Sequence, residues 1–276
     1  MTQLRTERLK QTKMAEDLRR YIVANAFSPE LALQLQRHAR HHRRAKQRRV
    51  RECDLVFLKF LPENLRQQLH REMYIPRLTK HPLFLRLAYG DPDAVDQLCR
   101  SAMGERALFV GEELFSLNET CSRMYLALSG DFLYYHLTRL GDVAMPFAGK
   151  ELDPVRIAEI VLWAPWDHRG RLVSSSACFF VELDSAKFRG IMKRRASSKP
   201  VCKYANAYIG EVLQVFDASW DLITDVVPQG LPIGALVEDA FLDLDFSEST
   251  QGRDLRGATR FLHEMGGIGH SLMNRL

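Results

Sequence analysis

The sequence predicts an α+β protein in which an N-terminal helical linker is followed by an antiparallel β-roll, jelly-roll-like, with flanking helices. Three observations predict this class. Apolar residues recur at near-helical spacing up to about residue 90, runs rich in aromatic and β-branched residues begin near Ala107, and helical spacing returns after Asp184. With 276 residues and 46% hydrophobic content, the chain is long enough to bury a sizeable core.

The first 90 residues are predicted to form short helices joined by turns. Ser28-Pro29 supplies an N-cap and a first-turn proline, and a later helix covers residues 63–70. Pro76 and Pro82 are expected to break the chain twice more. These helices hold too few apolar residues for a core of their own, so some should stay exposed and pack on a neighbouring subunit. Those residues are Leu55, Phe57, Leu58 and Leu61.

The strands of the roll are predicted from short apolar runs between turn signals. The clearest runs are residues 107–110, 113–116, 124–129, 132–137, 171–174 and 178–183. The turn signals between them are Gly111, Asn118, Ser129-Gly130 and residues 167–170. Asp184 is a plausible N-cap for a helix after the roll, and residues 204–216 suit a further amphipathic helix. Past Pro228 the periodicity is weak, so partial order is expected.

Charge is distributed unevenly along the chain, although the formal net charge is only +5. Nearly every residue from Arg37 to Arg51 is basic or a histidine, and residues 238–248 place acids between apolar residues, which makes the two segments natural partners. The basic run lacks interleaved aromatic residues, so nucleic acid is not the expected partner. A solvated or salt-bridged face is one interpretation, and contact with anionic lipid is the other.

Metal and enzyme chemistry find little support in the sequence. The five cysteines have no CxxC pairing, and His38, His41 and His42 share a helical face without a carboxylate or cysteine beside them, so no metal is expected. There is no nucleophile paired with a base and no glycine-rich phosphate loop between a strand and a helix. The chain is therefore predicted not to be an enzyme and to need no cofactor.

The segment from Arg123 to Asp131, RMYLALSGD, resembles a strand-turn-strand motif of the cyclic-nucleotide-binding domain. Val110-Gly111-Glu112 precedes it at the expected distance. Residues 157–163, IAEIVLW, look like the phosphate-binding cassette of that family, and residues 178–183 fall where its last strand ends. Residues 1–90 resemble the C-linker of voltage-gated and cyclic-nucleotide-gated cation channels, with the Leu-Pro of residues 54–66 and the MY and HPLF that follow.

This resemblance implies a ligand site for cAMP or cGMP. The implied site residues are Ile157, Ala158, Glu159, Ile160, His168, Arg169 and Arg171. Glu159 would accept a hydrogen bond from the ribose hydroxyl, whereas Ala158 stands where the family usually has glycine. His168 stands at the position of the arginine that binds phosphate, so Arg169 or Arg171 would have to replace it. Binding weakened roughly 10- to 150-fold is expected unless one of them does so.

Three further residues carry hypotheses of their own. Trp163 and Trp166 are expected in the core rather than stacked on a base. Ser197 follows Arg194-Arg195-Ala196, a pattern that basophilic kinases favour, and phosphate there would reorder the junction to the helix at 204–216. The pattern is short and often occurs by chance, so the alternative is that Ser197 is not phosphorylated.

The sequence thus predicts residues 1–90 as a C-linker-like region, 91–220 as the cyclic-nucleotide-binding-like roll with its closing helices, and 221–276 as a partly ordered tail. The resemblance implies a regulatory module of a tetrameric cation channel, potassium-selective by that analogy, on the cytoplasmic side of a membrane and soluble by itself. The pore would come from sequence outside this chain. The alternatives are a stand-alone nucleotide sensor or kinase regulatory subunit, and a ligand-free assembly module whose pocket is empty or filled by its own C-terminal residues.

Overall fold

The computed structural model describes residues 16–36, 39, 52, 55–138, 141–195, 197–218, 223–226 and 231–242. It forms two compact units, Met1–Arg51 and Glu52–Leu276. In the first unit residues 16–24 and 29–36 are helical, and the Ser28 hydroxyl accepts a hydrogen bond from the Leu31 N–H at 3.3 Å, as the predicted N-cap requires. The basic residues from Arg37 to Arg51, with His38, His41 and His42, lie outside the described residues. Their lipid, salt-bridge and metal interpretations therefore stay predictions.

The second unit begins with helices. A 3-10 helix η2 covers Val56–Phe60 and precedes α3 (Glu63–Leu78), α4 (Pro82–Gly90) and α5 (Pro92–Ser101). The prediction that Pro76 breaks the chain is wrong, because α3 continues to Leu78. Pro76 lies in the last turn of that helix, and burial of Tyr74 and Leu78 against the core holds the turn in place. Side chains cap the next two helices: His81 accepts from the Leu83 N–H, and Asp91 accepts from the Ala94 N–H.

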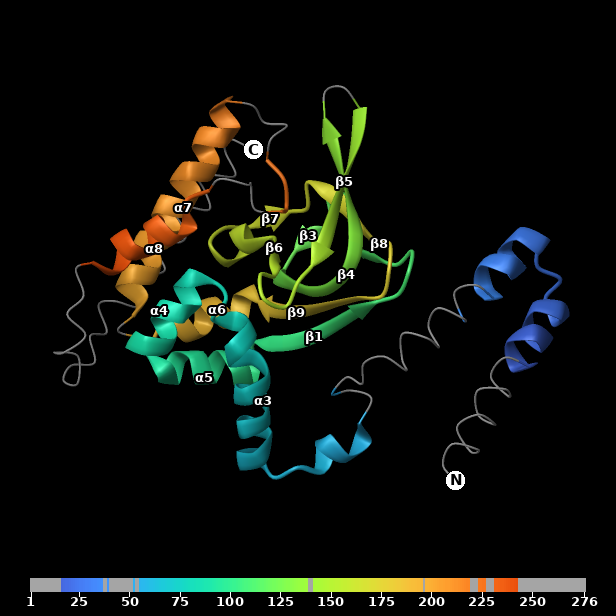
Figure 1. Ribbon diagram of the computed structural model, residues 1–276, viewed down its shortest axis with the longest axis horizontal. Coiled ribbons are helices and arrows are strands. Elements are labelled where there is room, and N and C mark those ends of the chain that lie inside the picture. Colours follow the sequence, from blue (N-terminus) through green and yellow to red (C-terminus); the bar gives the residue numbers. More distant parts are fainter. Residues whose placement is uncertain are drawn as a thin grey trace. The chain divides into compact units, whose positions relative to one another are not determined.

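The predicted class, a helical region followed by an antiparallel roll with flanking helices, is confirmed (Figure 1). One sheet has seven strands with the path β1-β9-β4-β8-β2, and β5 and β6 also pair with β4. A second sheet pairs β3 with β7. The strands are β1 (Met103–Leu108), β2 (Glu113–Phe115), β3 (Thr120–Cys121), β4 (Arg123–Thr138), β5 (Gly141–Gly149), β6 (Val155–Ile157), β7 (Trp166–Asp167), β8 (Gly170–Ser174) and β9 (Cys178–Asp184).

Strand β4 is the central strand of the roll and pairs with four others. Its first half pairs with β9 and β6, and its second half pairs with β8 and β5. The predicted turn at Ser129-Gly130 is therefore wrong, because one bent strand runs through it. The register shifts between Ala127 and Ser129, and Gly130 has φ +91°, where a Cβ atom would lie 2.4 Å from the Ala177 carbonyl oxygen. The glycine bends the strand so that it can serve both halves of the roll.

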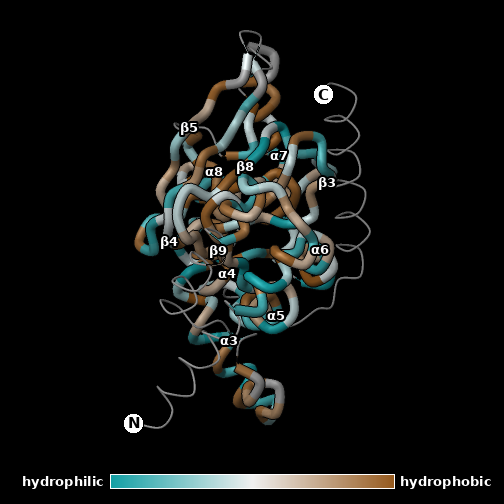
Figure 2. Tube along the Cα trace, turned by 90° about the vertical axis from the view of Figure 1, so that its right-hand side faces the viewer, coloured by the Kyte–Doolittle hydropathy of each residue, from teal (hydrophilic) through white to brown (hydrophobic). Residues whose placement is uncertain are grey.

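The helices after the roll close the unit. Asp184 caps α6 (Ser185–Met192) through the Lys187 N–H, as predicted, and α7 (Ser198–Ala218) follows. Helix α8 (Ile233–Phe241) lies in the segment where only partial order was expected. It packs on α4 and α7, and it is tied to them by the ion pairs Arg86–Glu238 and Lys203–Asp239 (Figure 1). Figure 2 shows hydrophobic stretches, coloured brown, gathering where β8, β9 and α8 are labelled.

Candidate functional site

The side chain at the centre of the predicted ligand site is an aspartate that the sequence analysis did not single out. Asp225 belongs to the short segment 223–226 after α7, and its side chain is fully buried. The neighbouring residue Val226 forms an antiparallel β-bridge with Ile157 at the end of β6. The Asp225 carbonyl oxygen accepts a hydrogen bond from the Ala158 N–H at 2.6 Å. The segment is thus held by its backbone inside the residues that were expected to bind a nucleotide.

The Asp225 carboxylate accepts five hydrogen bonds. Oδ1 accepts from Trp166 Nε1 and His168 Nδ1, both at 2.8 Å. Oδ2 accepts from the Tyr134 hydroxyl at 2.8 Å, the Arg169 N–H at 2.8 Å and the Gly170 N–H at 3.1 Å. A carboxylate accepts only, so His168 Nδ1 carries a proton. An anion bound through several backbone and side-chain donors is the arrangement that a phosphate would also require.

Burial and the charge of Asp225 together raise the pKa of Tyr134 far above its usual range. The phenol therefore stays a neutral hydrogen-bond donor to the carboxylate at any physiological pH. Gly170 also serves this contact, because a Cβ atom there would lie 2.4 Å from the Tyr135 carbonyl oxygen and 2.5 Å from the Tyr134 ring. Close packing of Gly170 against β4 brings the Gly170 N–H to Asp225.

The expectation that Arg169 or Arg171 supplies a cation at this place is not met by their side chains. Arg169 contributes its backbone N–H, while its guanidinium lies over the Trp166 ring at 5.2 Å. Arg171 pairs with Glu113 at 3.0 Å and lies over the Tyr135 ring at 4.7 Å. His168 does lie in the site, buried and stacked on Phe115 with ring centroids 3.6 Å apart. The imidazole of His168, hydrogen-bonded to Asp225, therefore occupies the position predicted for the phosphate-binding arginine.

The cassette-like segment lies where it was predicted, but the residue before it has a strained backbone conformation. It forms a 3-10 helix, η3 (Glu159–Leu162), preceded by Ala158 with φ 57° and ψ 36°. A non-glycine residue in this left-handed region costs roughly 1–2 kcal/mol. The hydrogen bond from the Ala158 N–H to Asp225 compensates part of that cost. Ile157 and Ile160 at the two ends of the turn are buried in the core.

Glu159 contacts residues of the chain itself, and its predicted hydrogen bond with a ribose hydroxyl stays a prediction. Its side chain is fully buried, and Oε1 accepts a hydrogen bond from the Tyr204 hydroxyl at 2.6 Å. Oε2 lies 3.0 Å from His81 Nε2, in a contact that falls outside hydrogen-bond geometry. His81 caps α4 and Tyr204 lies on α7, so Glu159 joins the helices before and after the roll to η3.

Burial by itself would raise the pKa of Glu159, but the His81 imidazole and the Tyr204 hydroxyl outweigh it and hold the pKa below its usual value. The same environment raises the pKa of Tyr204 well above its usual value, through burial first and the Glu159 charge second. The carboxylate therefore stays ionised and the phenol stays a donor. Trp163 and Trp166 are buried beside these groups, as predicted for core residues, and Trp163 stacks edgewise on Tyr204.

Ser197 lies at the junction of α6 and α7 and is buried. Its hydroxyl donates to Asp91 at 2.8 Å, and Arg195 pairs with the same aspartate at 3.4 Å. A kinase could reach this hydroxyl only after the junction opened, and the new phosphate would then face Asp91. Phosphorylation of Ser197 stays a prediction.

Within the described residues no group of three or more His, Cys, Asp or Glu side chains is placed to hold a metal ion. None of the helices in the described ranges is long and apolar enough to cross a membrane.

No protein-family model and no curated protein sequence matches the chain. Among solved structures, it is similar to a cyclic nucleotide-binding-like protein from Brucella abortus bv. 1 str. 9-941, at 19% identity over 39% of this chain and 90% of that one, with a TM-score of 0.33. It is also similar to the N-terminal domain of a transcriptional regulator from Streptomyces coelicolor A3(2), at 20% identity over 51% of this chain and 93% of that one, with a TM-score of 0.41. These identities and TM-scores are low, so the description of the fold rests on the strand order and register of the chain itself.

Proposed function

We propose that this chain is a regulatory module whose cyclic-nucleotide-binding-like roll is filled by an intrinsic ligand, the side chain of Asp225. One observation carries the proposal: the carboxylate accepts five hydrogen bonds at the position predicted for the nucleotide phosphate. Burying a carboxylate is costly unless it is paired and hydrogen-bonded. Five donors around one carboxylate support a site that is shaped for an anion. In this chain a side chain takes the place of a free anion.

The intrinsic ligand is connected directly to the closing helix. Only seven positions separate Asp225 from Ala218, the last residue of α7. Release of the segment 223–226 would therefore free the end of α7, and α7 is linked through Tyr204 and Glu159 to the N-terminus of α4. A two-state equilibrium between bound and released segment would couple the roll to the helices that precede it.

The parent protein in this proposal is a tetrameric cation channel, potassium-selective, with this module on the cytoplasmic side of its membrane and the pore supplied by other sequence. The support is the C-linker resemblance of the helical region. The chain would act by binding and assembly, without catalysis. The ligand-free assembly module remains the second candidate, because the occupied roll favours it equally.

Calorimetry with cAMP and cGMP tests the intrinsic ligand. Wild type is expected to give no heat with millimolar nucleotide, because Asp225 would have to leave its five donors before a phosphate could enter. Asp225→Ala frees those donors and is the variant in which weak binding should become measurable. Tight binding of either nucleotide to wild type would contradict the proposal and favour a nucleotide sensor.

Assembly with identical subunits is supported by apolar side chains on η2. Phe57 and Phe60 are 70% and 80% exposed, and Leu55 beside them is 44% exposed. Sedimentation is expected to show self-association at high micromolar concentration, reduced in Phe57→Ser and Phe60→Ser. The matched control is Tyr89→Ser, since Tyr89 on α4 is 81% exposed. A monomer at every concentration would count against the channel-linker assignment.

A further inference from the structure

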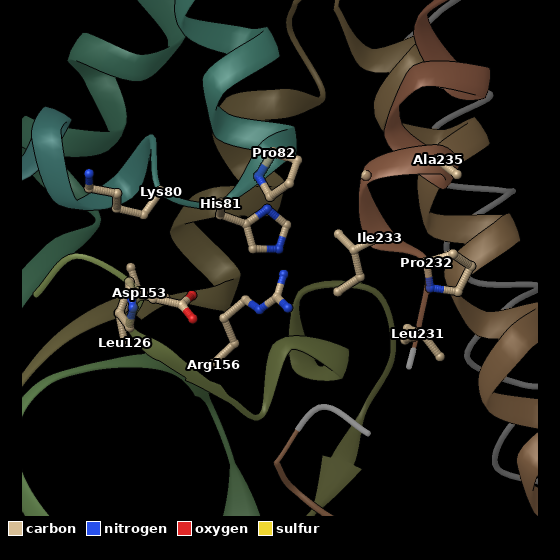
Figure 3. Close-up of a pocket in the computed structure, with 12 residues that line it drawn as sticks. Lys80, His81, Pro82, Leu126, Asp153, Arg156, Leu231, Pro232, Ile233 and Ala235 are labelled. Atoms are coloured by element: carbon tan, nitrogen blue, oxygen red, sulfur yellow. The ribbon is translucent and has the colours of Figure 1, made fainter. Parts of the chain in front are cut away.

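A cavity lies on the outside of the roll, apart from Asp225. It has a volume of about 360 Å³, close to the lower end of the roughly 300–1,000 Å³ typical of small-molecule sites. Its walls come from the turn before α4, from β4 and β6, and from the start of α8 (Figure 3). Seven of the twelve lining residues are apolar, and these are Pro82, Leu126, Pro154, Leu231, Pro232, Ile233 and Ala235.

The polar groups of this cavity are mostly donors. In Figure 3 the Arg156 guanidinium and the His81 imidazole point toward one another across the space. Arg156 is half-buried and makes no hydrogen bond or ion pair within the described part of the chain. His81 is 1% exposed, and its Nε2 has no hydrogen-bond partner there, although it lies 3.0 Å from Glu159 Oε2. The Arg156 guanidinium is therefore a donor without an acceptor among the described residues, whereas His81 Nε2 lies against the Glu159 carboxylate.

Two more features of the cavity favour negative charge. Lys80 lies at the rim, and the first turn of α8 has no capping side chain, so the N–H groups of Gly234 and Ala235 remain available. Asp153 at the rim and Glu159 behind His81 are the acids nearby. Because His81 accepts a hydrogen bond at Nδ1 and is neutral, Arg156 and Lys80 balance the charges of Glu159 and Asp153, and the N–H groups at the start of α8 add the positive end of a helix.

We propose that this cavity binds a small phosphate monoester, with the phosphate between Arg156 and the start of α8 and an apolar body against Leu126 and Ile233. The proposal goes beyond the intrinsic ligand and does not depend on it, because none of the five donors to Asp225 lines this cavity. Occupation would hold the N-termini of α4 and α8 against β6.

The test is titration calorimetry of the full chain with inorganic phosphate and with phenyl phosphate at constant ionic strength. Phenyl phosphate is expected to bind more tightly than inorganic phosphate, because its ring buries apolar surface. Arg156→Gln should weaken phenyl phosphate about 10- to 150-fold, the loss expected for one hydrogen bond between charged groups. The matched control is Arg100→Gln, since Arg100 is exposed at the end of α5, and it should bind like wild type.

Gly234→Asp separates loss of the ligand from loss of the fold. A Cβ atom at Gly234 meets nothing within 4 Å, and an aspartate in the first turn suits the helix dipole. This variant should stay folded, and its affinity for phenyl phosphate should be at least tenfold lower than that of wild type.

Vesicles containing phosphatidic acid, a lipid with a phosphate monoester, separate the two sources of the ligand. Co-sedimentation that requires Arg156 would assign the phosphate to a lipid headgroup, and binding of phenyl phosphate without vesicle binding would assign it to a free small molecule. The proposal is overturned if wild type binds neither probe, or if Arg156→Gln and Gly234→Asp both bind phenyl phosphate as wild type does.

Discussion

Replacing Asp225 by alanine is expected to lower the free energy of unfolding by about 3–5 kcal/mol, the range for removing one partner of a buried ion pair. The substitution leaves buried donors from Trp166, His168 and Tyr134 without an acceptor. Asp225→Asn keeps one carbonyl oxygen and should lose less. Chemical denaturation measures both variants.

The control for this prediction is Asp167→Ala. Asp167 lies on β7 close to the site but is exposed, so its loss should change the free energy of unfolding by less than about 0.5 kcal/mol. An Asp225→Ala variant as stable as this control would mean that the segment 223–226 does not occupy the roll in solution.

Glu159→Ala is expected to destabilise the protein by about 1–3 kcal/mol for each of the two buried donors that lose the carboxylate, the Tyr204 hydroxyl and the His81 Nε2–H group. Tyr204→Phe removes only the hydrogen bond to Oε1 and should cost about 1–3 kcal/mol. Glu72→Gln, at an exposed position on α3, is the matched control. Equal stability of Glu159→Ala and this control would contradict the link between α4, η3 and α7.

The pKa of Glu159 adds a pH dependence to this prediction. The groups that face the carboxyl are His81 on α4, Tyr204 and Tyr208 on α7, and Arg156 on β6. Because the folded pKa is lowered, the ionised form stabilises the fold fully above the unfolded value of about 4.3 and progressively less as the pH falls toward the folded pKa. Denaturation midpoints should therefore fall more steeply in acid for wild type than for Glu159→Gln. Parallel pH profiles would contradict it.

Much of the fold could be predicted because the signals were local. A short run rich in aromatic and β-branched residues marked β9, and Asp184 marked the start of α6. The errors arose where packing overrode local chemistry. Gly130 has the sequence signature of a turn, yet the chain passes through it as a bulged strand. Strand β5 was missed because Pro146 and its terminal glycines suppress the strand pattern, whereas β4 supplies a partner along its whole length.

The positions of the cassette-like turn and of His168 were predicted, but the residues that contact them were not. The cassette-like turn and His168 were located from spacing, since the roll fixes where those residues fall. What lies opposite them depends on contacts between residues distant in the chain. His81 is 78 positions before Glu159 and Asp225 is 57 after His168, and no local pattern reports either pairing. The one available signal for Asp225 was a single acid between the apolar residues Ile223 and Val226 just beyond the closing helix.

Amide hydrogen exchange at Arg169 and Gly170 tests the central claim most directly, because both N–H groups donate to Asp225 Oδ2. In wild type both amides should be strongly protected without any added ligand, and in Asp225→Ala both should exchange much faster than in Asp167→Ala. Fast exchange of both amides in wild type, with protection gained only on adding a cyclic nucleotide, would contradict an intrinsic ligand and assign the site to the nucleotide.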